Sequence, residues 1–141
     1  LGSDGGWVQQ LAAHGIEITP LASANSGLTV SWSQHLVERF AGTPLKRIKL
    51  VVGNTSFSGE LILTRTGLEG TPAYAAGPQI RKALSHAAGN PVDVMIDLRP
   101  DLSQSELERR LTKPRGKQSL NTFLRKSAGL TPPSPCSQPR S

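Results

Sequence analysis

The chain has 141 residues, of which 36% are hydrophobic and 18% are charged, so it can fold into one ordinary domain or two small subdomains, and wholesale disorder is excluded. No apolar run approaches the roughly 20 residues that a membrane span requires, and no secretory signal pattern is present. The single cysteine, Cys136, cannot form an internal disulfide, so we expect a cytoplasmic protein with no membrane partner.

The net charge of +6 is unevenly distributed along the chain. Residues 1–108 hold 8 Lys or Arg and 10 Asp or Glu, whereas residues 109–141 hold 8 Lys or Arg and no acid. The basic surplus therefore belongs to the C-terminal quarter. Such a segment suits nucleic acid, an acidic ligand or an acidic protein surface, and it equally suits a solvated helical face.

The first part of the sequence predicts short helices and strands. Ser3 or Asp4 can cap the free amides of a helix that ends at Gly15. Apolar residues then indicate strands over residues 16–21 and 28–32, and helical spacing follows over residues 33–42.

Strict alternation gives the clearest β signal. Ile48, Leu50 and Val52 alternate with more polar neighbours, which is the period-two pattern of a strand with one buried face. We expect a return strand over residues 60–64, a helix over residues 78–88 and a strand over residues 92–98 that Pro100 stops.

The last third of the chain is predicted to be helical. Ser103 and Glu106 match a capping box, in which the two side chains satisfy free amides at a helix start. Pro114-Arg115-Gly116 interrupts the chain, and Ser119 can cap a second helix. Residues 131–141 are rich in Pro and Ser with little to bury, so we expect them to be disordered.

Hairpin strands followed by segregated helices predict an α+β fold. The expected architecture is a small antiparallel β-barrel or sheet followed by a small helical bundle. We place the β-barrel subdomain at residues 16–100 and the helical subdomain at residues 101–130.

Nothing in the sequence forms a convincing catalytic or metal-binding set. His14, His35 and His86 are scattered without ligand spacing, so we expect no metal. Asp93 and Asp97 share one strand face, but this spacing fits a solvated outer face equally well. No catalytic residue is assigned.

Two glycine-rich stretches are candidates for a binding role. Residues 2–6 precede a helix, where free amides favour an anion, but they lack a preceding strand and the G-x-G-x-x-G spacing. Gly67 and Gly70 follow a predicted strand and imply positive φ or the close approach of another body. Spacing alone favours a tight connection between a strand and a helix for this second stretch.

Ordered motifs across residues 2–130 carry a resemblance to a known family. The run Gly2-Ser3-Asp4-Gly5-Gly6-Trp7 resembles the T-G-S-D-G-x-W stretch of the BaiN/YhiN-like NAD(P)/FAD-dependent oxidoreductases. Further matches follow in the same order at residues 20–21, 32–33, 39–46, 59–61, 64, 67–70, 74, 96–101, 114–116 and 124–126. A chance run of loose matches in register is improbable.

The resemblance implies a fold and a cofactor. In that family this region is an insertion in the FAD-binding domain of a flavoprotein of the two-dinucleotide-binding type, a β-barrel followed by a helical bundle. Residues 1–15 would then be a remnant helix of the FAD-binding domain, with Ser3, Asp4 and Gly5 beside the flavin. The complete enzyme would use FAD, with NAD(P)H as reductant.

The resemblance also implies a substrate-facing loop over residues 67–70. The residues it assigns to this role are Thr64, Gly67, Glu69 and Gly70. Much of the wider family has a histidine after the threonine and a serine between the glycines, whereas this chain has Arg65 and Glu69. This departure resembles a subgroup of the family.

No glycine fingerprint or second half of a flavin domain is present, so we expect the chain not to hold FAD tightly and to need the missing FAD-binding segments as partner. It would shape the active site around hydride transfer to a small-molecule or RNA substrate. The alternative is a polyanion- or RNA-binding module whose phosphate contacts come from Arg109, Arg110, Lys113, Arg115 and Lys117.

Overall fold

The computed structural model describes residues 4–130 and confirms the α+β prediction. A five-stranded antiparallel sheet, a half-barrel with strand order β1-β4-β3-β2-β5, forms the centre. The strands are β1 (Leu28–Thr29), β2 (Thr43–Val52), β3 (Thr55–Leu63), β4 (Gly67–Glu69) and β5 (Met95–Asp97). The helices are α1 (Trp7–Ala13), α2 (Gln34–Phe40), α3 (Thr71–Ala75), α4 (Gly77–His86), α5 (Gln104–Leu111) and α6 (Leu120–Ala128).

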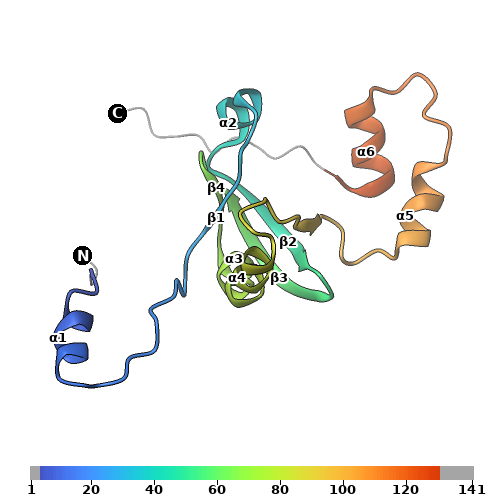
Figure 1. The fold of residues 1–141 in the computed structure, drawn as a ribbon. Coiled ribbons are helices and arrows are strands. Elements are labelled where there is room, and N and C mark those ends of the chain that lie inside the picture. The colour runs from blue at the N-terminus through green and yellow to red at the C-terminus, as the bar shows by residue number, and fades with distance from the viewer. Residues whose placement is uncertain (1–3, 131–141) are drawn as a thin grey trace.

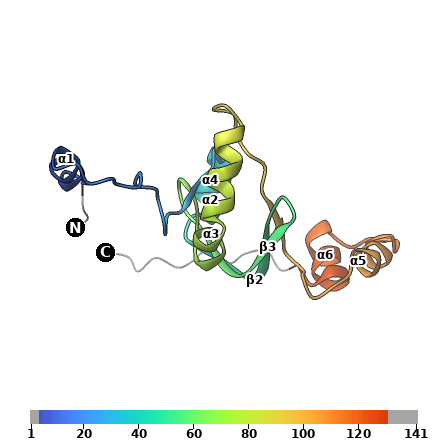
Figure 2. The same cartoon turned by 60° about the horizontal axis from the view of Figure 1, so that its bottom comes forward.

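The elements fall into three groups along the molecule (Figures 1 and 2). Helix α1 lies at one end, connected to the sheet by a long segment without regular structure. Helices α3 and α4 pack beside the central sheet, and the pair α5 and α6 lies at the opposite end from α1. Among the described residues, none of these helices combines the length and apolar character needed to cross a bilayer.

The hairpin of β2 and β3 organises the sheet. Val52 pairs with Thr55 across a two-residue turn, in which Gly53 takes a left-handed φ of 56°. The register shifts between Leu45 and Ile48, which is a β-bulge. Because a bulge inserts one extra residue, it reverses the face to which later side chains point.

Burial along β2 shows the effect of this bulge. Thr43 is buried before it, whereas Ile48, Leu50 and Val52 are buried after it. The predicted alternation from Ile48 onward is therefore confirmed, and it holds only on one side of the bulge. The main apolar cluster lies on this inner face, where helices α3 and α4 add Ala73, Ala76 and Ile80.

The helical pair forms through its caps. The Ser103 hydroxyl accepts a hydrogen bond from the amide of Glu106 at 3.2 Å, and the Ser119 hydroxyl accepts one from the amide of Thr122 at 3.2 Å. Helix α6 ends at Gly129 with a left-handed φ of 64°. Both predicted helix starts are confirmed. The reciprocal half of the capping box is wrong, because the Glu106 carboxylate accepts from Arg109 and Arg110 instead.

Three strand predictions are wrong in whole or in part. Residues 16–21 form no strand. Just after this stretch, the carbonyl of Ser23 accepts a hydrogen bond from the side chain of Arg81 in α4. The strand predicted over residues 28–32 pairs only at Leu28–Thr29, and that over residues 92–98 pairs only at Met95–Asp97. The last two segments have the apolar pattern of a longer strand, but a neighbouring strand pairs with them over only two or three residues.

The substrate-facing loop predicted over residues 67–70 is also wrong as a loop. Gly67–Glu69 is strand β4, which pairs with both β1 and β3, and Gly70 is the N-cap residue that precedes α3. At the N-terminus, Gly6 caps α1 with no side-chain hydrogen bond to the helix, so the cap predicted at Asp4 is wrong; its carboxylate accepts from the amide of Gly6 at 2.9 Å. Ser3 and the predicted disordered tail lie outside the described residues.

Thr43 gives a first stability prediction. Its side chain is 1% exposed, and within residues 4–130 its hydroxyl has no hydrogen-bond partner. Because an unsatisfied buried hydroxyl costs about 1–3 kcal/mol, Thr43→Val should raise the free energy of unfolding by about 1 kcal/mol in a chemical denaturation series. Thr55→Val, at an exposed position of β3, is the control and should change it little. A loss of stability in Thr43→Val would show that the hydroxyl is satisfied.

Candidate functional site

The bulge of β2 opens a hollow on the surface of the sheet. This hollow, the bulge cleft, has a volume of about 710 Å³. It is lined by Lys46, Arg47, Ile48, Ser58, Gly59, Glu60 and Pro100. Its volume and largely apolar lining are typical of small-molecule sites.

The bulge itself positions the charged side chains of this cleft. Lys46 and Arg47 together lie opposite Glu60, because Leu45 pairs with Leu61 while the next pair along the strands is Ile48 with Gly59. Arg47 takes a left-handed φ of 54°, a conformation that costs a non-glycine residue about 1–3 kcal/mol. Bulges often lie next to active sites, where they redirect side chains.

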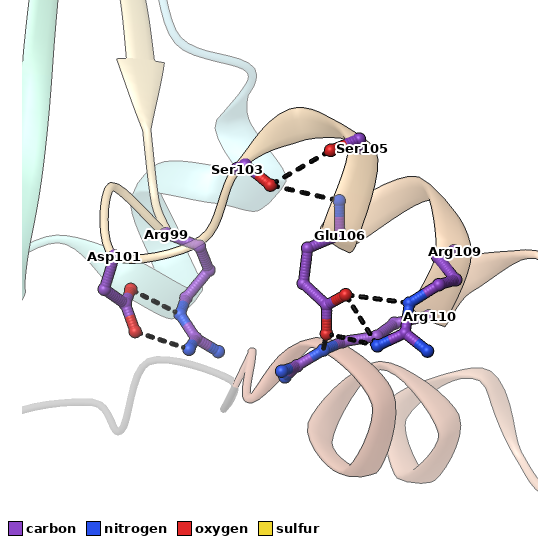
Figure 3. A network of polar contacts seen from close by, with 7 residues as sticks. All are labelled: Arg99, Asp101, Ser103, Ser105, Glu106, Arg109 and Arg110. Carbon is purple, nitrogen blue, oxygen red and sulfur yellow. Dashed lines mark hydrogen bonds and ion pairs between the residues drawn. The ribbon is translucent and has the colours of Figure 1, made fainter.

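An arginine beyond β5 ties the sheet to the helical pair (Figure 3). Arg99 donates to both carboxylate oxygens of Asp101: Nε lies 3.0 Å from Oδ1, and Nη2 lies 2.8 Å from Oδ2. A methyl group added at Gly129 would lie 2.1 Å from Nη1 of Arg99, so the guanidinium covers the C-terminal end of α6. A cation is favourable at this end of a helix.

The Arg99–Asp101 pair predicts a pH dependence. The hydrogen bond from Arg99 is the main cause that lowers the pKa of Asp101 from 3.8 to about 2, and the charge of Arg47 adds to it. Because the folded-state pKa is depressed, the contribution of this pair to stability is complete above pH 3.8 and is lost as the pH falls toward 2. An NMR titration should place the Asp101 midpoint near 2, and in Arg99→Gln nearer 3.8. A wild-type midpoint at 3.8 would contradict the pairing in solution.

The residues predicted to face substrate serve the sheet in this structure. Thr64 and Gly67 close the tight turn between β3 and β4, where the amide of Thr64 donates to the carbonyl of Gly67 at 2.8 Å. Gly70 packs against the backbone of Glu60, and a methyl group there would lie 2.4 Å from the Glu60 carbonyl oxygen. Glu69 is exposed. None of these four lines the bulge cleft, although Gly70 adjoins it through Glu60.

Two of the residues predicted to lie beside a flavin, Asp4 and Gly5, come directly before α1, which is at the far end of the molecule from the helical pair (Figure 1). Helix α1 has seven residues, and the amide of Gly6 at its start is already bonded to the carboxylate of Asp4. Gly5 has a left-handed φ of 75°. The place of Asp4 and Gly5 beside a flavin stays a prediction.

The bulge cleft was not among the sequence predictions. Lys46, Arg47 and Glu60 were part of a strand pattern in which the alternation fails between Leu45 and Ile48. That failure was the available signal for a bulge. Pro100 reaches the cleft through the pairing of β5 with β2, which no local pattern predicts.

A second hollow, the α5–α6 cleft, is lined by basic residues. It has a volume of about 360 Å³ and is bounded by Glu106, Arg109, Arg110, Lys113, Lys126 and Ser127. Three of the five residues predicted to bind a polyanion therefore meet in one place. Arg115 and Lys117 lie in the connection between the helices and do not line this cleft.

The three histidines and the two aspartates singled out in the sequence lie apart in the structure. Within residues 4–130 no group of three or more His, Cys, Asp or Glu side chains could hold an ion. His14 follows the last residue of α1, and His35 and His86 are exposed residues of α2 and α4. Asp93 and Asp97 are both exposed, but only Asp97 belongs to strand β5, so the prediction that they share one strand face is wrong.

A comparison with protein families matches most of the chain. Residues 22–133 match the family model described as "HI0933-like protein barrel and H2TH domain". A search of curated proteins found no match. The half-barrel and the α5–α6 pair fall within the matched region.

Proposed function

The chain belongs to the HI0933-like family, which is associated with flavoprotein oxidoreductases, and from this we propose that it is the substrate-side insert of an NAD(P)/FAD-dependent oxidoreductase of the BaiN/YhiN type. The family match carries this proposal. In the complete enzyme the insert would cover the reacting groups, contact the substrate and exclude water during hydride transfer.

The packing of the N-terminal segment supports the proposal. Helix α1 buries none of its residues, and Leu11, Ile16 and Leu21 are between 37% and 63% exposed. Several exposed large apolar residues in one segment are typical of a surface that another protein segment covers. We propose that the covering surface is the FAD-binding domain, to which residues 1–15 would belong.

We propose that FAD is held by those other segments, with NAD(P)H as reductant. Bound FAD would supply the hydride chemistry. The bulge cleft is the candidate for this chain's substrate contacts, because it combines an apolar floor at Ile48 and Pro100 with charged groups that fix orientation. Lys46 and Arg47 would orient an anionic or carbonyl group, and Glu60 would accept a hydrogen bond from the substrate.

Complementation in trans tests the proposal. The chain is mixed with the FAD-loaded domain of an HI0933-like flavoprotein from which the corresponding barrel and helices have been removed. We expect the two to associate and the rate of flavin reoxidation by ferricyanide to fall, because the insert shields the flavin. Leu11→Asp and Ile16→Asp should abolish association while leaving the circular dichroism of the chain unchanged, since both positions are exposed. Absence of association with the wild-type chain would refute the proposal.

The alternative function, a polyanion- or RNA-binding module, gains no support from the family match. Its five contact residues do not all line one hollow, because Arg115 and Lys117 lie outside the cleft that collects Arg109, Arg110 and Lys113. Phe123, the aromatic residue of this region, is only 9% exposed. It therefore offers no stacking platform for bases.

A further inference from the structure

The α5–α6 cleft concentrates positive charge in one hollow. Arg109 and Arg110 belong to α5, Lys113 lies two residues beyond its end, and Lys126 comes from α6. Glu106 is the one carboxylate among the residues that line the cleft. The lining therefore carries a surplus of three positive charges.

Glu106 holds the guanidinium groups of Arg109 and Arg110 by hydrogen bonds (Figure 3). Its carboxylate accepts from Nε and Nη2 of Arg109 at 2.8 and 2.9 Å, and from Nε of Arg110 at 2.6 Å. Both arginines also lower the pKa of Glu106, which keeps it ionised. Within residues 4–130, Nη1 and Nη2 of Arg110 donate to no acceptor. These hydrogen bonds fix the two guanidinium groups and leave Nη1 and Nη2 of Arg110 available to a ligand.

The two lysines complete the cleft from different elements. Neither Lys113 nor Lys126 forms an ion pair within the part of the chain that the structure describes. Ser127, beside Lys126 on α6, adds a hydroxyl to the lining. Guanidinium and ammonium groups therefore line one hollow, and each guanidinium is already held by at least one hydrogen bond. This arrangement is suited to the recognition of a phosphate group.

We propose that the α5–α6 cleft binds a single phosphate group of a phosphomonoester through Arg109, Arg110, Lys113 and Lys126, with Glu106 as a positioning residue. The donors surround one hollow instead of following a surface, so they suit one terminal phosphate and not a nucleic-acid backbone. This site is separate from the bulge cleft, and its binding test needs no flavin.

Binding to the 141-residue chain tests the site with inorganic phosphate and adenosine monophosphate as probes. Both are titrated at constant ionic strength, with amide NMR shifts and calorimetry as readouts. Arg110→Gln or Lys126→Gln should weaken binding at least about tenfold, because each removes a charge-assisted donor. Arg115→Gln is the matched control, since it removes the same charge outside the cleft and should change the affinity less than about twofold.

Glu106→Gln separates positioning from net charge. If the cleft acted only through its field, removing this negative charge would strengthen phosphate binding. We expect weaker binding, because glutamine keeps only one of the two acceptor oxygens that hold the arginines and loses the negative charge. The circular dichroism of each variant checks that α5 remains folded. Because Lys126 belongs to α6, Lys126→Gln still tests the proposal if a variant of α5 unfolds.

Three results would overturn the proposal. The first is an absence of phosphate-induced shifts at the cleft. The second is an equal loss of affinity in Arg110→Gln and Arg115→Gln, which would indicate a diffuse field. The third is much tighter binding of a single-stranded RNA oligomer with equal dependence on Arg115 and Lys117, which would indicate a polyanion track. Stronger shifts with adenosine monophosphate than with phosphate alone would support the site and identify a nucleotide as its ligand class.

Discussion

Gly67→Ala should lower the free energy of unfolding by about 3–5 kcal/mol, among the largest effects of a single substitution. A methyl group at this position would lie 1.7 Å from the carbonyl oxygen of Leu28 and 3.0 Å from the Cα atom of Thr29. Both atoms belong to backbone that is paired with β4. Neither can yield without separating β1 from the sheet.

The measurement is a urea denaturation series with Gly53→Ala as the matched control. Gly53 also has a positive φ, of 56°, but a methyl group there would meet no atom within 4 Å. Its replacement should cost only the strain of a left-handed alanine, about 1 kcal/mol. A loss at Gly67 no larger than that at Gly53 would show that β1 does not pair with β4 in solution.

The same substitution addresses the role assigned to Gly67 by family resemblance. In this structure the glycine is required for the close approach of two strands. Glu69 differs, because its side chain is exposed on the same strand. The substrate-facing role of both residues stays a prediction.

Local signals explain which parts of the fold the sequence predicted. The caps at Ser103 and Ser119 and the alternation after Ile48 depend on residues within one turn or one strand. The prediction of β2, the β2–β3 hairpin and the α5–α6 pair is therefore confirmed. The extent of pairing depends on a second strand far along the chain, which explains why residues 16–21 form no strand and why β5 is short.

In the candidate sites, too, the sequence predicted local features but not contacts between distant segments. The basic residues of α5 were visible as a charge run, but their convergence with Lys126 depends on how two helices pack. Likewise, Arg99 and Gly129 are far apart in the sequence, and their contact required the fold. The sequence offered the residue types of each cleft, while the bulge and the helix packing decided which of them meet.

Leu50→Ala should lower the free energy of unfolding by about 2–5 kcal/mol, the usual cost of a leucine cavity in a core. Leu50 is 0% exposed and lies at the centre of the sheet, paired with Phe57 of β3 on one side and Ile96 of β5 on the other. The cavity would therefore weaken the contacts of three adjacent strands.

Ile62→Ala is the control for this prediction, because Ile62 is an aliphatic residue of β3 that is 40% exposed on the other face of the sheet. It should cost about 1 kcal/mol or less. Equal losses at the two positions would mean that the apolar cluster is not packed on the face that carries Leu50. The larger loss at Leu50 would also confirm the register after the bulge, since a shift of one residue would exchange Leu50 with Val51 at the core. The placement of Lys46 and Arg47 at the bulge cleft depends on that register.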